Sequence, residues 1–126
     1  MTVLTQPPTM GDVLKYEVNP NYTRETVTLL QGMAYPVGAV LGRISASGKY
    51  TLATSGGTDG AQTAAAVLLY AVDTTLADAT GIVLVRGPAI VSRAALAYDA
   101  TVNDAAKIAT KHGQLTALGI AVRDTA

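Results

Sequence analysis

The chain has 126 residues, and its nine basic and nine acidic side chains give a formal net charge of zero. This length is most simply one domain and is sufficient for a sizeable apolar core. The charges are scattered and form no basic block, which excludes electrostatic attraction to nucleic acid or to an anionic membrane surface.

The composition is unusually poor in charge. Charged residues make up 14% of the chain, whereas about 25% is usual for a globular domain. Hydrophobic residues reach 49%, yet the chain has no Phe and no Trp, so small aliphatic side chains supply the apolar share. We therefore expect part of the surface to be covered by other chains. The alternative is an Ala-rich monomer.

Cysteine is absent, which excludes a disulfide framework and a thiolate metal site. The first residues lack the charged and apolar regions of a signal peptide. The longest apolar run is about half of the roughly 20 residues that a membrane-spanning helix needs. We expect a protein that is made and used in a cytoplasm.

Residues 1–22 are predicted to be an irregular arm. Pro7, Pro8, Gly11 and Pro20 interrupt this stretch, and its apolar periodicity is weak. Such an arm is either disordered or folds on a partner. Its prolines restrict the unfolded chain, so that ordering it costs less entropy than ordering a Gly/Ser tail.

The following stretch predicts three strands. Residues 24–30 alternate apolar and polar side chains, with Val27 and Leu29 on one face, which is typical of a half-buried strand. Residues 37–44 form a second apolar run that contains Gly38 and Gly42, where a bend or a close backbone approach is expected. A hairpin turn centred on Ser47 and Gly48 then leads to a return strand at 50–52.

The middle of the chain predicts its most buried strand. Asp59 and Gly60 favour a turn, and residues 64–72 have almost no polar side chain, so we expect a strand that is buried on both faces. Residues 82–85 predict another buried strand. Gly87 and Pro88 should then break the chain at a tight corner before residues 89–91 continue.

One helix is expected near the C-terminus. Val102, Ala105, Ala106 and Ala109 fall on one helical face, which we expect to be buried close to the sheet. Thr101 or Asn103 is the expected cap, Asp104 suits the positive first turn, Lys111 and His112 suit the negative end, and Gly113 is the expected left-handed terminus. A last short strand is expected at 118–122, with Ile120 and Val122 inward.

These elements predict a mainly β (α+β) fold. We expect a small compact β domain with one short C-terminal helix and an irregular N-terminal arm. The arm would comprise residues 1–22 and the single β-rich domain residues 23–126. From the residues alone, the chain is a small β-rich domain without a recognisable active site.

The candidate chemical groups each have a structural explanation. His112 is the only histidine, and one imidazole without a cysteine makes neither a zinc site nor a catalytic triad. Asp73, Asp78, Asp99 and Asp104 lack the spacing of a calcium loop. Each is expected at a turn or a helix start.

The Gly-rich segment 55–60 lacks the Lys and Ser/Thr of a phosphate-binding loop, and no helix pattern begins there. A contact surface is the more reasonable role for it. The six tyrosines form no stacking platform in the sequence and are expected in core or rim packing.

The order of these elements resembles the head decoration proteins of tailed bacteriophages, the family of the lambda head protein D. The resemblance covers most of residues 23–123. It is carried by TRETVT at 23–28, GAVLG at 38–42, GKY at 48–50, TDGA at 58–61, the pairs 67–68 and 72–73, and GIAV at 119–122.

This resemblance implies a structural role and no enzymatic activity. Members of the family are small, mainly β proteins that bind the outer surface of the expanded capsid as homotrimers at its three-fold and quasi-three-fold points. They clamp neighbouring subunits of the major capsid protein against internal DNA pressure. The resemblance implies no cofactor, metal, nucleic acid, membrane or small-molecule substrate, and a location on the virion after synthesis in the bacterial host cytoplasm.

The resemblance also implies that the N-terminal arm orders against the shell by strand addition. The expected capsid-binding residues are Thr2, Val3, Leu4, Thr5, Gln6, Pro7 and Pro8. Two other functions stay open at this stage: a free-standing β-rich binding module, for instance for a sugar or a peptide, and a tail or fibre component of the virion. An enzyme is the class that the sequence favours least.

Overall fold

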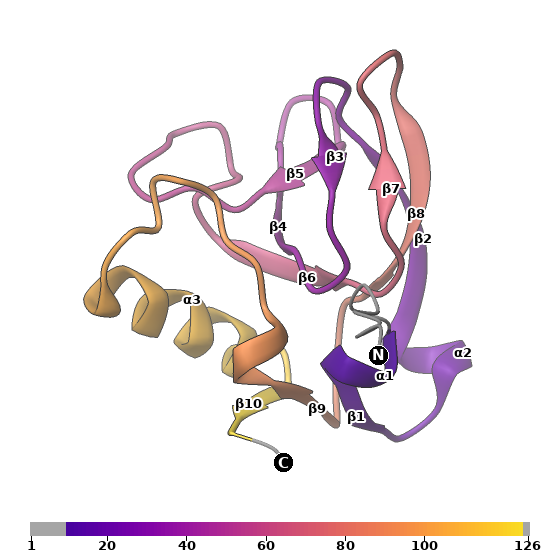
Figure 1. The fold of residues 1–126 in the computed structure, drawn as a ribbon, viewed down its shortest axis with the longest axis vertical. Coiled ribbons are helices and arrows are strands. Elements are labelled where there is room, and N and C mark those ends of the chain that lie inside the picture. Colours follow the sequence, from indigo (N-terminus) through magenta and orange to yellow (C-terminus); the bar gives the residue numbers. More distant parts are fainter. Residues whose placement is uncertain (1–9, 125–126) are drawn as a thin grey trace, which may run out of the picture.

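Short β-rich runs separated by Gly-containing turns suit a barrel of short strands, and the computed structural model, which describes residues 10–124, contains one (Figure 1). A three-stranded sheet lies at one end of the barrel and a helix at its side. The strands are β1 (Leu14–Glu17), β2 (Arg24–Leu29), β3 (Ala34–Tyr35), β4 (Val40–Arg43), β5 (Tyr50–Leu52), β6 (Ala64–Leu68), β7 (Val72–Asp73), β8 (Ala79–Leu84), β9 (Ala89–Ser92) and β10 (Ile120–Arg123). The helices are α1 (Met10–Val13), α2 (Pro20–Thr23) and α3 (Ala105–Ala117), with a 3₁₀ turn at Arg93–Ala95.

The barrel has the strand order β2-β5-β4-β6-β8 and closes on itself. Its neighbours are antiparallel except for β2 and β5, which meet in parallel where Leu29 lies opposite Tyr50. A backbone hydrogen bond of 2.8 Å from Leu30 to Tyr50 continues this contact. Closure removes free strand edges from the barrel. The predicted hairpin between residues 43 and 50 is confirmed.

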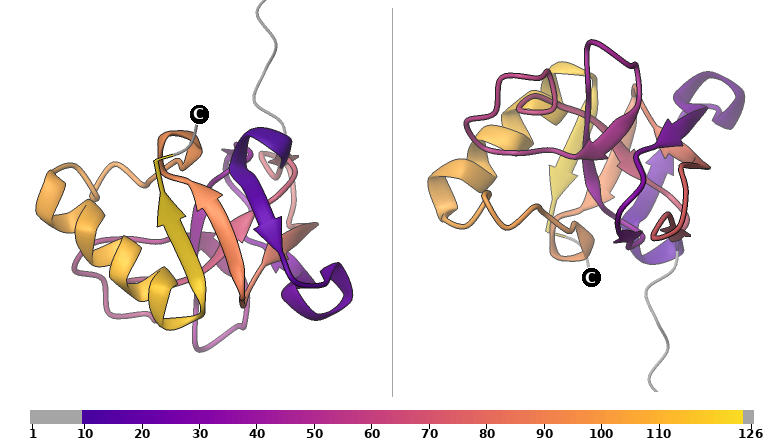
Figure 2. Two further views of the ribbon diagram at one scale, coloured as in Figure 1. Left: turned by 90° about the horizontal axis from the view of Figure 1, so that it is seen from below. Right: turned by 90° about the horizontal axis from the view of Figure 1, so that it is seen from above.

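The second sheet has the order β1-β9-β10, with β9 antiparallel to β1 and parallel to β10 (Figure 2, left). The chain reaches β9 from the barrel through the corner at Gly87 and Pro88, which are joined by a cis peptide bond. Gly87 packs directly on Gly119, where a side chain on Gly87 would collide with the backbone. The expected corner and the last strand are therefore confirmed.

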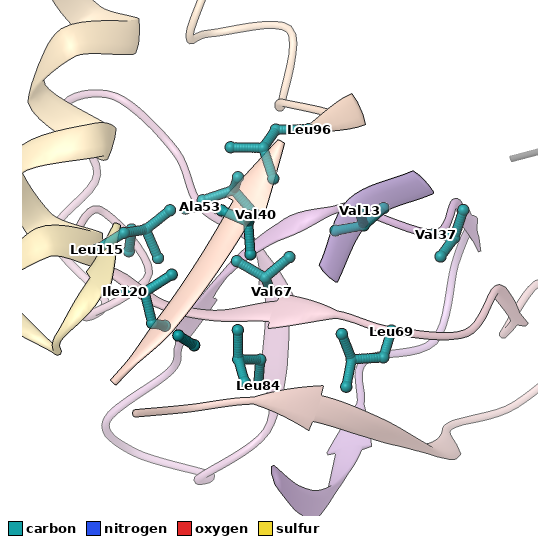
Figure 3. Close-up of a cluster of buried hydrophobic side chains, with 13 residues drawn as sticks. Val13, Val37, Val40, Ala53, Val67, Leu69, Leu84, Leu96, Leu115 and Ile120 are labelled. Atoms are coloured by element: carbon teal, nitrogen blue, oxygen red, sulfur yellow. The ribbon is translucent and has the colours of Figure 1, made fainter. Parts of the chain in front are cut away.

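Strand β6 is buried on both faces, as its sequence predicts, because it lies between two apolar clusters. Ala66 and Leu68 point into the barrel, whereas Val67 and the following Leu69 point toward the three-stranded sheet. Figure 3 shows this second cluster, which joins the barrel to α1, α3 and the sheet. Tyr35 is buried in the barrel cluster and donates a hydrogen bond of 2.8 Å to the carbonyl of Leu30.

Several expected strands are too long. The central strand ends at Leu68 and not at Val72, because the chain turns there and Val72 joins Ala34–Tyr35 in a separate two-stranded sheet. The strand expected at 37–44 is shorter, since Gly38 has a φ of +84° and its backbone packs against the carbonyl of Ala95. Ile82, expected to be buried, lies on the outer barrel face and is 39% exposed.

The predicted helix exists, but its predicted buried face is wrong. Ala105, Ala106 and Ala109 are exposed, and Lys111 and Leu115 are the buried residues of α3. The cap is Asp104, whose carboxylate accepts a hydrogen bond of 2.8 Å from the amide of Lys107. Gly113 lies inside the helix, and the left-handed residue after it is Gly119, with a φ of +86°.

The expectation of irregular structure is wrong for residues 10–22. These residues form α1, β1 and α2, and Val13 is completely buried in the cluster between barrel and sheet. Asn19 caps α2 by accepting a hydrogen bond of 2.9 Å from the amide of Asn21. Apolar anchoring and local capping thus order this stretch despite its weak periodicity.

Candidate interaction surface

The N-terminal segment enters the fold at a fixed point. Residues 10–13 form α1, which lies against β9 and the 3₁₀ turn, and Val13 anchors it in the core. The predicted capsid-binding residues, Thr2 to Pro8, lie outside the described residues. Their role therefore stays a prediction, and the structure specifies only where the chain that carries them begins.

Strand β1 is at one edge of its sheet. It pairs with β9 on one side, and no strand formed by residues 10–124 pairs with it on the other. An edge strand of this kind presents backbone donors and acceptors to which an extended segment of another chain can pair. Lys15 and Tyr16 of β1 are exposed.

Exposed apolar side chains gather next to this edge. Tyr16 and Val18 lie in and just after β1, and Tyr22 lies in α2; all three are at least half exposed. The guanidinium carbon of Arg86 is 5.3 Å from the centre of the Tyr22 ring, within the range of a cation–π contact. We call Tyr16, Val18, Tyr22 and Arg86 the β1–α2 surface. Tyr and Arg are enriched at protein interfaces.

Two ion pairs lie beside the β1–α2 surface. Arg24 binds both carboxylate oxygens of Glu17, which also accepts a hydrogen bond of 2.6 Å from the Thr23 hydroxyl. Burial raises the pKa of Glu17, but the bonds from Arg24 and Thr23 outweigh it and hold that pKa below its ordinary value. Arg86 and Glu25 form a second pair at 2.7 Å.

The four aspartates of the sequence analysis hold turns and a helix start. Asp73 accepts from the amide of Thr75, Asp99 from Thr101, and Asp104 caps α3. Asp78 accepts a bond of 2.7 Å from the amide of Gln31 and pairs with Lys49 at 2.6 Å. The side-chain contact with Lys49 and the amide of Gln31 lower the pKa of Asp78. Their predicted structural roles are confirmed.

The Gly-rich loop forms a shallow polar hollow of about 400 Å³ with Thr54 and Thr101. Ser55 donates its amide to the Thr101 hydroxyl, and Asp59 accepts from the amide of Ala61, so the loop is held at both ends. It leads through a turn into strand β6. Its amides therefore adjoin a strand and not the positive N-terminus of a helix.

His112 lies in the middle of α3, and its expected role at the helix end is wrong. Its Nε2 atom is 2.6 Å from the hydroxyl of Tyr98, and the two rings are tilted against each other. Burial lowers the pKa of His112, and the positive charge of Arg93 lowers it further. The pair thus fastens α3 to the segment that follows the 3₁₀ turn.

We expect this contact to make stability fall in mild acid. Because the pKa of His112 is depressed in the folded state, the unfolded chain takes up the proton first as the pH falls below about 6.5, the ordinary value for histidine. Urea unfolding at pH 7.5 and pH 5.5 measures the change. His112→Gln should remove most of this difference; an equal loss in the variant and the wild-type protein would contradict the assignment.

Lys111 is a second polar contact of α3 and is only 2% exposed. Its ammonium group donates to the carbonyl of Gln62, and Gln114 beside it accepts a bond of 2.7 Å from the amide of Ala64. Burial lowers the pKa of Lys111. These contacts connect α3 to the start of β6 and explain why a lysine occupies the inner face of the helix.

Within residues 10–124, no three His, Cys, Asp or Glu side chains lie close enough to hold a metal ion. None of the helices in this range is both long and apolar enough to cross a membrane.

Comparison with known protein families connects this fold to a function. The family described as bacteriophage lambda head decoration protein D matches residues 3–120. The chain belongs to this family. The resemblance seen in the sequence is thereby confirmed, and with it the class of a structural phage head protein, located in the virion capsid. No curated protein matches the chain at a significant level.

The sequence analysis did not identify the β1–α2 surface as a candidate interaction surface. Three residues of the β1–α2 surface, Tyr16, Val18 and Tyr22, fall within the stretch that we expected to be an irregular arm. The signal that would have revealed it is Asn19 before Pro20, a capping residue followed by a proline at the first helical position. Tyr16, Val18 and Tyr22 around that motif are then exposed on ordered structure.

Proposed function

We propose that this decoration protein binds the outer surface of the expanded phage capsid as homotrimers at three-fold and quasi-three-fold sites. There it clamps neighbouring subunits of the major capsid protein and stabilises the shell against the pressure of packaged DNA. The observation that carries the proposal is the family match across residues 3–120. We further propose synthesis in the host cytoplasm.

The surface chemistry supports a structural partner. Only 14% of the residues are charged, and two ion pairs, Arg24–Glu17 and Arg86–Glu25, lie beside the β1–α2 surface. Desolvating paired charges and aromatic side chains costs less than desolvating free ions. Contacts of modest size suffice, because each trimer would engage several capsid subunits at once and gain avidity.

We propose that residues 2–8 are the capsid-binding arm and that they bind as an added strand. The division into an arm and a domain then falls near residue 10 and not after residue 22, because α1 and β1 belong to the folded part. An extended segment that leaves an anchored helix can pair with a strand edge of the shell.

Electron cryo-microscopy of expanded shells incubated with the purified protein tests this proposal. We expect density for three copies at each three-fold and quasi-three-fold position, joined to the shell at the start of α1. Undecorated shells from the same preparation are the control. Density at the tail or at another symmetry position would overturn the proposed location.

A further inference from the structure

The sequence contains a single Asp–Gly pair, Asp59–Gly60, and no Asn–Gly pair. Among aspartates, one that precedes a glycine isomerises most readily, because glycine has no side chain that shields the peptide nitrogen between the two residues. That nitrogen can attack the carboxyl carbon of the aspartate and close a succinimide ring. The turn at Asp59 is therefore where a spontaneous covalent change of the backbone is to be sought.

The side chain of Asp59 folds back along this peptide bond. Its Oδ1 atom accepts a hydrogen bond of 3.0 Å from the amide of Ala61, two residues further on. A carboxylate bonded in this way lies beside the peptide nitrogen of the intervening residue, which here is Gly60. Asp59 is also exposed, so water has access to its carboxyl group. The two reacting groups are thus neighbours in the folded chain.

The backbone of this turn is fixed against the end of β4. The carbonyl of Asp59 accepts a hydrogen bond of 2.9 Å from the amide of Ser45. A Cβ atom on Gly60 would lie 2.6 Å from the carbonyl oxygen of Arg43 and closer still to the Ser45 hydroxyl, so Gly60 packs tightly here. The folded chain therefore cannot separate the two reacting groups by moving the turn.

The amide of Gly60 has a specific partner. It donates a hydrogen bond of 2.8 Å to the side-chain oxygen of Gln62. A peptide nitrogen attacks a carboxyl carbon only after it loses its proton, and this bond holds the proton away from base in the solvent. Gln62 is itself held in place, because its backbone carbonyl accepts a hydrogen bond from the buried ammonium group of Lys111.

We propose that Asp59 is a site of isoaspartate formation and that the side chain of Gln62 restrains the reaction. The Gly60 nitrogen forms a bond with Cγ of Asp59, and the amide proton and the carboxyl hydroxyl leave together as one water molecule. Water then opens the succinimide. Cleavage at the side-chain carbonyl restores aspartate, whereas cleavage at the main-chain carbonyl leaves isoaspartate, in which the backbone runs through the former side chain.

Isoaspartate at this position would disturb the link between β4 and β6. The extra methylene group in the main chain would move the Asp59 carbonyl away from the amide of Ser45. It would also displace Ala61, whose backbone packs directly on Gly42 of β4. The modified chain should therefore unfold at a lower temperature than the unmodified chain, and Gln62 preserves the barrel by slowing its formation.

Incubation of the purified full chain at neutral pH tests this inference, with isoaspartate at residue 59 measured by mass spectrometry. Gln62→Leu keeps the bulk of the side chain but removes the acceptor, and should raise the rate by roughly three- to tenfold, the equivalent of one hydrogen bond. Gln62→Glu retains an acceptor and should react no faster than the wild-type protein. Asp59→Glu should give no isomer, because its longer side chain does not form a succinimide.

The same incubation in urea provides the reference for the unfolded chain. There the wild-type protein and Gln62→Leu should isomerise at one common rate, faster than that of the folded wild-type protein, because the bond to Gln62 exists only in the fold. Equal rates for folded wild-type protein and folded Gln62→Leu would overturn the role of Gln62. So would a folded wild-type chain that isomerises as fast as the unfolded one. Absence of isoaspartate at residue 59 in urea would overturn the site itself.

Discussion

Removal of residues 1–9 is expected to abolish saturable binding to expanded shells while leaving the folded domain intact. The domain should survive because its first anchored element, α1, begins at Met10 and inserts Val13 into the core. Binding should be lost because the segment that we propose to add to the shell as a strand is gone. Shell co-sedimentation measures the loss of binding, and thermal unfolding measures whether the domain stays folded.

Two further variants sharpen this test. Replacing residues 2–8 by a Gly/Ser segment of equal length should also abolish binding. This variant keeps the length of the arm, so a loss of binding would show that the side chains of residues 2–8 are required. Removing residues 1–22 should instead destabilise the fold, since it deletes Val13 and the strand that pairs with β9. Shell binding by the 1–9 deletion at wild-type affinity would refute the arm.

The second large effect is expected from Gly42→Val in strand β4. A Cβ atom at this position would lie 2.3 Å from the carbonyl oxygen of Ala61 and 2.6 Å from its Cα atom. Both are backbone atoms that cannot rotate away, so β4 and the turn before β6 would have to separate. We expect unfolding free energy to fall by about 3 kcal/mol or more.

A second glycine provides the control for Gly42→Val. Gly113 lies inside α3, with no atom near the position of a Cβ. Gly113→Ala should therefore raise the unfolding free energy by about 0.5 to 1 kcal/mol, because alanine loses less backbone entropy in a helix. Urea unfolding of both variants measures the contrast. A Gly42→Val protein as stable as the wild-type protein would show that β4 does not approach Ala61 so closely.

The barrel strands could be predicted where their apolar pattern has a single interpretation. β6 has apolar side chains on both faces, and both faces are buried because it separates two clusters. Gly42 was expected to mark a close backbone approach, and it does. The short strand pairs, such as β3 with β7, could not be predicted, since two residues carry no periodicity.

The helix α3 was predicted in the right place, but its apolar pattern indicated the wrong buried face. Ala105, Ala106 and Ala109 have the spacing of an apolar face, but alanine gains little from burial. Ile108 and Leu115 offer more apolar surface, and the helix turns this side inward. Lys111 lies between them and is accommodated because the backbone carbonyl of Gln62 accepts a hydrogen bond from its ammonium group. A buried lysine made the true face look polar in the sequence.

The candidate surfaces depend on contacts between distant segments, which a single sequence does not reveal. Tyr22 and Arg86 are 64 positions apart and meet only because β2 pairs with β8. The family and fold class, in contrast, followed from the order of motifs along the chain.

Co-sedimentation with expanded and unexpanded shells of the phage that encodes this protein tests the central claim most directly. We predict saturable binding to expanded, undecorated shells at about one copy per major capsid subunit, and no binding to unexpanded shells. Absence of binding to either form would contradict a decoration role and would show that the family match reports the fold of this chain and not its place in the virion.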